Sequence, residues 1–180
     1  MSDAGMDLTI RRAVSADAEL LAGLGARTFR EAFAGDNSPE DMALYVGKAY
    51  GVSQQRAELT NPEITTLLAD VDGSLAGYAQ LRANAAPECV GATRALELWR
   101  FYVAAPWHGR GVARALMDSV VMEARARQAE TLWLAVWERN ERAKAFYRKC
   151  GFVDAGAQVF VLGRDVQSDR VMARSLCRDR

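Results

Sequence analysis

Hydrophobic residues along the chain follow two periods, and the changes of period mark out the elements. Alternating or continuous apolar runs predict strands over residues 8–14, 64–71, 74–81, 96–103, 131–137, 152–162 and 166–176. Apolar residues three or four apart predict helices over residues 15–33, 38–49, 110–129 and 140–150, with a short helix over residues 53–59. The pattern therefore predicts an α/β fold with about seven strands and flanking helices.

Cap and turn residues support these boundaries. Ser15 is expected to cap the first helix, and Ser38 before a proline is expected to cap the second. Asp72 and Gly73 favour a tight hairpin, and Gly151 is expected to end the helix before it.

The order of the elements is strand, two helices, three strands, helix, strand, helix and two strands. It places antiparallel hairpins at both ends and helical crossovers in the middle. We therefore expect one domain with a mixed sheet over residues 1–180, in which residues 1–6 are flexible.

The residues that follow the fourth strand have the features of an anion site. Gly109 and Gly111 lie in a turn that opens a helix, and Arg110 and Arg114 add positive charge. The first turn of a helix has unpaired N–H groups and a partial positive charge, and glycine lets a ligand approach the backbone. The turn is therefore predicted to hold a phosphate or pyrophosphate.

The glycines alone leave several interpretations open. A dinucleotide site needs a third glycine, and the sequence GRGVAR at residues 109–114 lacks it. A triphosphate-binding loop needs Gly-Lys-Ser/Thr, which is also missing. The remaining alternative to a phosphate site is a helix start that needs glycine only for close packing.

Composition and charge exclude other classes of protein. Lys and Arg equal Asp and Glu at 23 each, so no overall field attracts nucleic acid or an anionic membrane. Three cysteines without a C-x-x-C pair and a single histidine argue against a disulfide framework, a zinc site and a His-rich metal centre. No apolar run approaches the roughly 20 residues of a membrane span, and the start does not look like a targeting peptide. We expect a cytoplasmic protein without a metal.

Two motifs together resemble a known family. HGRGVA at residues 108–113 is similar to the Gln/Arg-x-x-Gly-x-Gly/Ala signature of the GNAT N-acetyltransferases. An apolar strand and N-x-x-A-x-x-F-Y-x-x-x-G-F at residues 140–152 resemble the second half of the family's site. The resemblance covers nearly the whole chain. ELWRFYV at residues 97–103 and VWERNE at residues 136–141 look most like the bacterial spermidine/spermine acetyltransferases.

The resemblance implies a reaction and a set of cofactor contacts. Acetyl-CoA would give its acetyl group to a primary amine by direct attack in a ternary complex. The fourth and fifth strands would splay apart to admit the pantetheine arm, which pairs with the backbone of residues 101–103. The implied cofactor-binding residues are Phe101, Tyr102, Val103, His108, Gly109, Arg110, Gly111, Val112, Ala113, Asn140 and Tyr147.

One position departs from the family signature. His108 stands where Gln or Arg is usual, and a neutral imidazole can still donate one hydrogen bond to a phosphate. We expect cofactor binding to be weaker or pH-dependent at most. The alternative is that the His108 ring points to solvent.

Tyr147 matches the tyrosine with which the family protonates the leaving thiolate of CoA. A phenol suits this role because its pKa is close to that of a thiol. The alternative is a buried aromatic beside Phe146. Since adjacent helix positions point in different directions, we assign Phe146 to the core and Tyr147 to the reaction. Asn140 could cap its helix, contact the cofactor, or do both.

The general base is predicted to be Glu97. Strand alternation would place Glu97 on one face with Trp99 and Phe101, where a carboxylate among aromatic rings could take up a proton. The alternative is a solvent-facing strand glutamate. Glu138, at the end of the fifth strand, is a weaker candidate.

The amine acceptor is expected to bind beside the first two helices. That region combines acidic and aromatic residues, which would suit a cationic polyamine. Peptide amines, aminoglycosides and other small amines remain alternatives, as does a non-catalytic CoA sensor. Two copies of the chain could pair through the last strands, including residues 158–162. The candidate acceptor residues are Phe29, Arg30, Glu31, Phe33, Asp36, Glu40, Asp41 and Tyr45.

Overall fold

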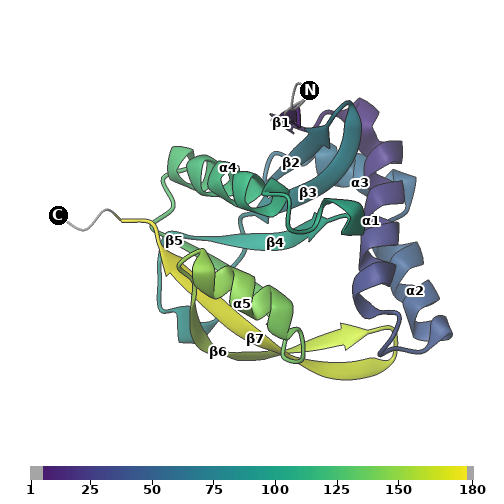
Figure 1. Cartoon of the computed structure of the whole chain (residues 1–180). Coiled ribbons are helices and arrows are strands. Elements are labelled where there is room, and N and C mark those ends of the chain that lie inside the picture. Colours follow the sequence, from purple (N-terminus) through teal and green to yellow (C-terminus); the bar gives the residue numbers. More distant parts are fainter. Residues whose placement is uncertain (1–5, 178–180) are drawn as a thin grey trace.

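The computed structural model describes residues 6–177, so the expected flexibility of residues 1–5 lies outside the described residues. The strands and helices follow the predicted order (Figure 1). The strands are β1 (Leu8–Arg12), β2 (Ile64–Val71), β3 (Ser74–Arg82), β4 (Ala95–Val103), β5 (Thr131–Trp137), β6 (Val153–Leu162) and β7 (Asp165–Ser175). The helices are α1 (Ala18–Phe33), α2 (Pro39–Ala49), α3 (Val52–Thr60), α4 (Val112–Ala126) and α5 (Glu141–Lys149).

All seven strands form one mixed sheet in the order β1-β2-β3-β4-β5-β7-β6. Only β4 and β5 run parallel, and the other neighbours are antiparallel. On β3, Ala79 and Leu81 pack in the same apolar cluster as α4, whereas Tyr78 packs with α1. Because successive strand residues point to opposite faces, α4 and α1 cover opposite faces of the sheet. The predicted mixed α/β fold is confirmed.

The sheet opens between β4 and β5. These strands pair only from Ala95 opposite Thr131 to Glu97 opposite Trp133. Beyond Glu97, β4 pairs with β3 alone, so its other edge has no neighbouring strand up to Val103. The expected splay of the fourth and fifth strands is confirmed, and it creates a passage through the sheet.

A β-bulge in β4 changes which side chains share a face. Trp99 has no partner on β3, and the pairing shifts by one residue there. An extra residue reverses the alternation beyond it. Glu97 therefore shares the α1 face with Tyr102, whereas Phe101 points to the α4 face. The expectation that Glu97 and Phe101 share a face is wrong, because strict alternation does not survive a bulge.

The start of α2 fixes the tip of the β6–β7 hairpin. The hydroxyl of Ser38 accepts the Asp41 amide at 3.1 Å, which confirms the predicted cap. Asp41 in turn accepts the Arg164 amide at 3.0 Å. At Gly163 in the hairpin turn, a Cβ would lie 2.6 Å from the Asp41 carboxylate. Only glycine allows this approach, which closes α2 against β6.

The start of the first helix differs from the prediction. Ser15 does not cap α1 but lies in a 3-10 turn over Ser15–Asp17. Asp17 stands at the N-cap of α1 without a side-chain cap bond, and its carboxylate instead accepts the Val14 amide at 2.8 Å and two bonds from Arg11. Ser15 and Asp17 are both suitable cap residues, and propensity alone does not distinguish them.

Candidate active site

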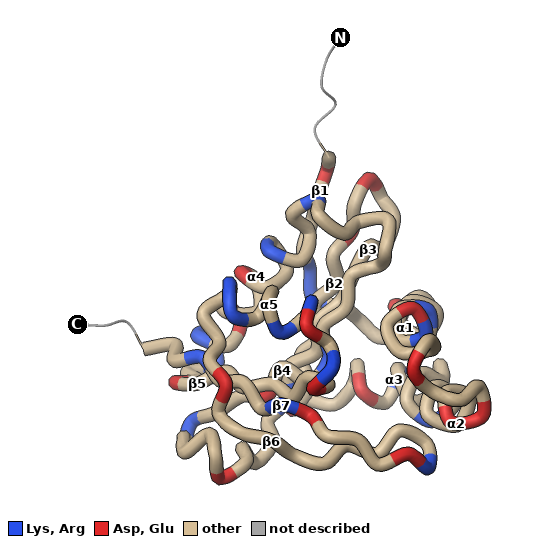
Figure 2. Tube along the Cα trace, turned by 60° about the horizontal axis from the view of Figure 1, so that its bottom comes forward, with Lys and Arg blue, Asp and Glu red and all other residues tan. Residues whose placement is uncertain are grey.

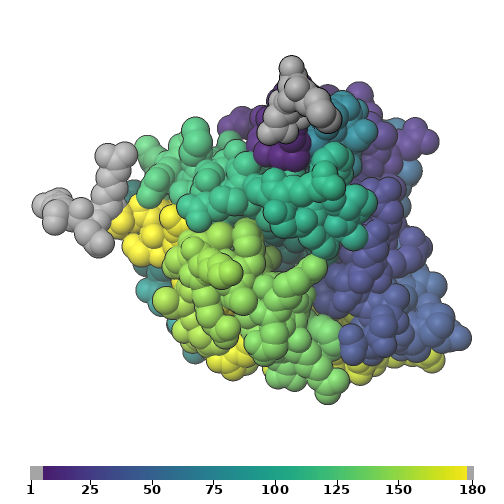
Figure 3. Space-filling model, in the orientation of Figure 1, coloured from purple at the N-terminus to yellow at the C-terminus, as the bar shows by residue number. Residues whose placement is uncertain are grey.

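A cleft of about 640 Å³ passes through the opening between β4 and β5. Its walls come from both faces of the sheet, so it joins α4 and α5 on one side with α1 and α2 on the other. In Figure 3 the teal and green residues of α4 and α5 lie beside one another, with the blue residues of α1 and α2 beyond them. We refer to the two halves as the α4–α5 side and the α1–α2 side.

The glycine turn opens onto the α4–α5 side. Gly109 and Gly111 have φ values of 74° and 83°, which residues other than glycine rarely adopt. A Cβ at either position would meet nothing within 4 Å, so these glycines do not serve close packing. The first hydrogen bond of α4 runs from the Ala115 amide to the Gly111 carbonyl. The Val112 and Ala113 amides precede it and have no partner within the helix. The turn has the properties of an anion cradle.

His108 is held by two neighbours. Its Nε2 lies 2.7 Å from the Val103 carbonyl, and its Nδ1 lies 3.1 Å from the Arg142 guanidinium. The carbonyl only accepts and the guanidinium only donates, so both bonds form when the neutral ring carries its proton on Nε2. The ring therefore joins the end of β4 to α5. In this arrangement its one N–H is not directed at a phosphate, and it does not simply point to solvent.

Two arginines supply charge near the turn. Arg142 lines the cleft and contacts His108. Arg110 lies over the Trp107 ring at 5.5 Å, and its amide donates to the Trp107 carbonyl at 3.4 Å. Arg142 was missed by the sequence analysis, because only the packing of α5 beside the turn brings it there.

Tyr147 lines the cleft from α5 and is buried among aromatic rings. Its ring lies 6.2 Å from that of Phe101 and 5.8 Å from that of Phe152. Burial raises the pKa of Tyr147 above its usual value, with a smaller contribution from Cys150, so the phenol stays protonated. Within residues 6–177 its side chain makes no hydrogen bond that would occupy this proton.

The assignment of Phe146 to the core is wrong in part. Phe146 is only half-buried and stacks on Phe101 at 5.6 Å, whereas Tyr147 is the more buried of the two. Both rings contact Phe101 on the open edge of β4, and they also contact each other at 5.6 Å. Asn140 caps α5, where its side chain accepts the Ala143 amide at 3.0 Å, and it also lines the cleft.

Glu97 is buried at the α1–α2 side and fully engaged. Arg82 donates to its carboxylate at 2.5 and 3.2 Å, and Asn84 donates at 2.8 Å. The Arg82 guanidinium also lies 4.0 Å from the Trp99 ring. The solvent-facing alternative is wrong, since only 4% of Glu97 is exposed. Its carboxylate neutralises Arg82, which leaves few lone pairs for a substrate proton.

Aromatic rings form most of the α1–α2 side. Phe29 and Tyr45 stack at 4.5 Å, and Phe33 meets Trp137 at 5.9 Å. Phe160 from β6 meets Tyr45 at 5.6 Å. Of the acidic residues expected here, Glu31 lines the cleft, whereas Asp41 holds the hairpin tip; Asp36 and Glu40 are exposed and outside the cleft lining.

Asp169 on β7 is a cleft residue that sequence reasoning missed. It is 7% exposed, and its Oδ1 is buried without a hydrogen-bond partner among the described residues. Burial raises the pKa of Asp169 to about 6, and the charge of Glu138 adds to the effect. The sequence signal was a single aspartate at an inward position of the last strand.

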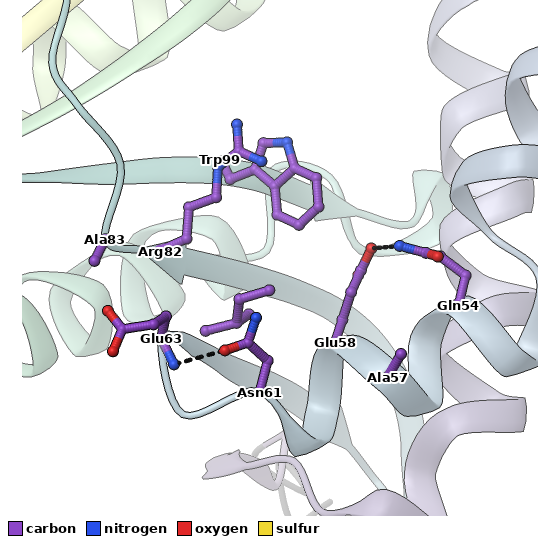
Figure 4. A pocket seen from close by; sticks show the side chains of 9 residues that line it. Gln54, Ala57, Glu58, Asn61, Glu63, Arg82, Ala83 and Trp99 are labelled. Atoms are coloured by element: carbon purple, nitrogen blue, oxygen red, sulfur yellow. Dashed lines mark hydrogen bonds between the residues drawn. The ribbon is translucent and has the colours of Figure 1, made fainter.

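A smaller cavity of about 300 Å³ adjoins the cleft through Arg82 and Trp99. Figure 4 shows Trp99 and Arg82 on one side of it and Glu58 on the other, where Glu58 accepts from Gln54. Glu58 also pairs with the buried guanidinium of Arg100 at 2.6 Å. This buried pair joins α3 to β4 and stiffens the floor of the α1–α2 side.

Three wider features describe the rest of the molecule. Figure 2 shows acidic and basic positions interspersed along the trace, in keeping with the formal net charge of zero. Among residues 6–177, no helix is long and apolar enough to cross a membrane. The same residues contain no cluster of three or more metal-binding side chains.

Comparisons with known proteins assign the family. A model of the acetyltransferase (GNAT) family matches residues 26–152. An N-acetyltransferase from Mycobacterium bovis, itself uncharacterised, is 37% identical over 160 residues, covering 89% of this chain and 98% of the relative. The chain belongs to the GNAT family of N-acetyltransferases.

Other relatives agree with this GNAT assignment. An uncharacterised N-acetyltransferase from Lactobacillus delbrueckii subsp. lactis is 34% identical over 153 residues, covering 85% of this chain and 88% of the relative. A solved structure of PaiA N-acetyltransferase from Thermoplasma acidophilum, in complex with coenzyme A, has a TM-score of 0.77 at 20% identity. It covers 94% of this chain and 99% of that one, and at this identity it supports the GNAT fold.

Proposed function

We propose that this GNAT enzyme transfers an acetyl group from acetyl-CoA to a primary amine by direct attack in a ternary complex. The observation that carries the proposal is the cleft that passes between β4 and β5. One end is an anion cradle of backbone amides, and the other is an aromatic chamber with carboxylates. Donor and acceptor can therefore enter from opposite faces of the sheet and meet in the passage.

The residues of the α4–α5 side fit a CoA ester. Free amides at Val112 and Ala113 and open space over both glycines suit a pyrophosphate. The edge of β4 at residues 101–103 has no neighbouring strand, and its backbone groups other than the Val103 carbonyl suit pairing with an extended pantetheine arm. When bound, acetyl-CoA supplies an activated acetyl group as a thioester. His108, Arg110 and Asn140 stay predicted contacts around it.

We propose that Tyr147 gives its phenolic proton to the leaving thiolate. The raised pKa of this buried phenol keeps it protonated, so a proton is available as negative charge develops on sulfur. The prediction that Glu97 is the general base stays open to test: Glu97→Gln would then lower the rate at neutral pH and leave CoA binding intact. Its bonds to Arg82 and Asn84 favour instead a role in positioning Arg82.

For the acceptor, we propose a cationic small amine, with polyamines such as spermidine as the first candidates. The support is the combination of aromatic rings with Glu31 and Asp169 on the α1–α2 side. Peptide N-termini and aminoglycosides carry the same ammonium group and are the alternatives. This interpretation would also place the chain beside the spermidine/spermine acetyltransferases it resembles.

The test is a thiol-release assay with acetyl-CoA and a panel of polyamines, aminoglycosides, amino acids and peptides. An N-acetyltransferase releases free CoA only when a suitable amine is present. A CoA sensor would bind CoA, measured by calorimetry, without turnover of any amine. Thermal stabilisation by ATP or NAD but not by CoA would contradict the proposal altogether.

We further propose that residues 1–180 act as one catalytic domain in the cytoplasm and form a homodimer through β6. This strand lies at the edge of the sheet, and Val159 and Val161 on it are exposed together with Val166. An exposed apolar edge favours pairing with a second copy. Analytical ultracentrifugation of wild type and Val159→Lys tests this: a dimer should become monomeric in the variant.

A further inference from the structure

The last strand places one carboxylate at the wall of the α1–α2 side. In the sheet, Asp169 on β7 is paired with Trp137 of β5 and with Gln158 of β6. Directly paired residues of antiparallel strands share a face. All three side chains therefore point to the same face, and all three line the cleft. The inference below rests on the proposed transfer of an acetyl group to an amine.

The environment of Asp169 lacks what a buried carboxylate normally has. Its side chain is as hidden as that of Glu97, yet Glu97 accepts three hydrogen bonds. Within the described part of the chain, Asp169 accepts none, and its Oδ1 is wholly buried. Leaving an anionic oxygen without a donor is unfavourable unless a ligand supplies one. A protonated amine would supply both the donor and the opposite charge.

The surrounding rings fit the same ligand. Trp137 and Phe33 meet edge to face at 5.9 Å, and Tyr45 and Phe160 do so at 5.6 Å. Burial raises the pKa of Tyr45 to about 12, with contributions that include the charge of Asp169. The Tyr45 phenol therefore lies within electrostatic reach of the carboxylate. Aromatic faces around a single anion are the usual environment for an alkylammonium group.

We propose that Asp169 binds the amino group of the acceptor and takes its proton during acetyl transfer. The amine nitrogen bonds to the carbonyl carbon of the acetyl group as the carbon–sulfur bond breaks. Before this attack, Asp169 takes one proton from the bound ammonium group and passes it to water, which gives nitrogen its lone pair. As the amide forms, the second proton lost from nitrogen moves to Asp169, and the proton needed by sulfur comes from Tyr147. Asp169 then returns a proton to Tyr147 through water, so one proton is released per turnover and the chain returns to its starting state.

The protonation of Asp169 supports this role. With a pKa of about 6, its carboxylate is charged at neutral pH yet more basic than an ordinary aspartate. Glu138 at the end of β5 acts on it most directly among the charged groups. The other titratable or charged groups that line the same cleft are Glu31, Tyr45, Tyr50, Arg82, Glu97, Arg100, Tyr102, His108, Arg142 and Tyr147.

The test compares Asp169→Asn with wild type, using spermidine and the panel amine with the highest kcat/KM. At pH 7 we expect kcat/KM for the amine to fall at least 100-fold while the Kd for CoA changes less than threefold. The deficit should shrink towards pH 10, because an amine that is already neutral needs no base. In a plot of kcat/KM against pH, the wild type should lose activity as the pH falls through about 6, which we call the acidic limb, and the variant should lack this limb. Asp154→Asn, on the same hairpin but outside the cleft, is the matched control and should retain wild-type rates.

The outcomes separate this inference from the proposed function. If wild type acetylates no amine in the panel, the proposed function fails. If wild type is active and Asp169→Asn keeps its rate and acidic limb, only the role of Asp169 is overturned. Should Asp169→Asn not fold, Asp169→Glu and wild type decide the matter. An unchanged rate in Asp169→Glu, or a wild-type profile without an ionisation between pH 5 and 7, would count against Asp169.

Discussion

The two sides of the cleft offer their proposed ligands different kinds of groups. On the α4–α5 side the candidate anion-binding groups are main-chain amides, placed by two glycines with positive φ and by the start of α4. On the α1–α2 side they are side chains from strands and helices far apart in the sequence. Main-chain recognition leaves a short local motif, whereas side-chain recognition leaves none. This difference explains why the donor is easier to infer than the acceptor.

The largest effect should follow from breaking the main-chain side. In Gly111→Val, a β-branched residue would have to adopt a φ of 83°, which disfavours the turn by roughly 1–3 kcal/mol. We expect the KM for acetyl-CoA to rise at least 30-fold and the KM for the amine to change little. Initial rates with each substrate varied in turn measure this. Gly35→Val, at a glycine without positive φ, is the control. Equal changes in both KM values would mean that the turn does not act on acetyl-CoA binding alone.

The next effect should fall on the passage that joins the two sides. Tyr147→Phe removes the proton donor and keeps the ring that packs on Phe101 and Phe152. We expect kcat to fall about 10- to 100-fold with CoA affinity retained, which is less than the roughly 100- to 10,000-fold typical of general acid catalysis because water can supply the proton to sulfur instead. Steady-state rates and calorimetry check it. Wild-type turnover in Tyr147→Phe would assign the proton on sulfur to solvent.

A third prediction concerns stability on the side-chain side. Because the pKa of Asp169 is raised to about 6, the folded protein binds more protons than the unfolded chain between about pH 4 and 6. Ionising Asp169 therefore lowers stability as pH rises through this window, and the loss persists above it. Asp169→Asn should melt roughly 5 °C above wild type at pH 8 and close to it at pH 4.5. A variant that melts below wild type at pH 8 would reveal a hidden partner for the carboxylate.

Glu97→Gln is expected to lower stability, in contrast to Asp169→Asn, although both residues lie on the same face of the sheet. Its carboxylate holds Arg82 and Asn84, so the variant leaves a guanidinium without its counter-ion. We expect a melting point several degrees below wild type at pH 7, and a modest loss of rate with the acidic limb retained. Melting curves and pH profiles measured together decide between the two carboxylates. Loss of the acidic limb of the pH–rate profile in Glu97→Gln would identify Glu97 as the general base.

The smallest effect is expected from substituting His108, the residue that departs from the family signature. In His108→Gln an amide can still donate to the Val103 carbonyl and accept from Arg142. The KM for acetyl-CoA should therefore change less than threefold between pH 6 and 8. A larger or pH-dependent change would mean that the His108 ring itself contacts the donor.

Much of the fold could be predicted because local signals agree with the final packing. The bounds of β2 and β5 are as predicted, since Asp72-Gly73 ends one strand and a buried apolar run defines the other. The cap at Ser38 and the glycine turn were predicted for the same reason. Prediction failed where partners decide, as at Ser15, where the neighbouring Asp17 gains two bonds from Arg11.

The candidate site also has parts that depend on neighbouring residues in the sequence and parts that depend on distant ones. The sequence by itself determined the family, the anion cradle and the tyrosine on α5, because each depends on residues close together in the chain. Only the tertiary structure decided the face of Glu97, since a bulge at Trp99 is a property of the pairing of β4 with β3. It also decided the place of Asp169, whose surroundings come from α1, α2, β5 and β6. A carboxylate acquires its properties from what surrounds it, and that is fixed only when distant segments meet.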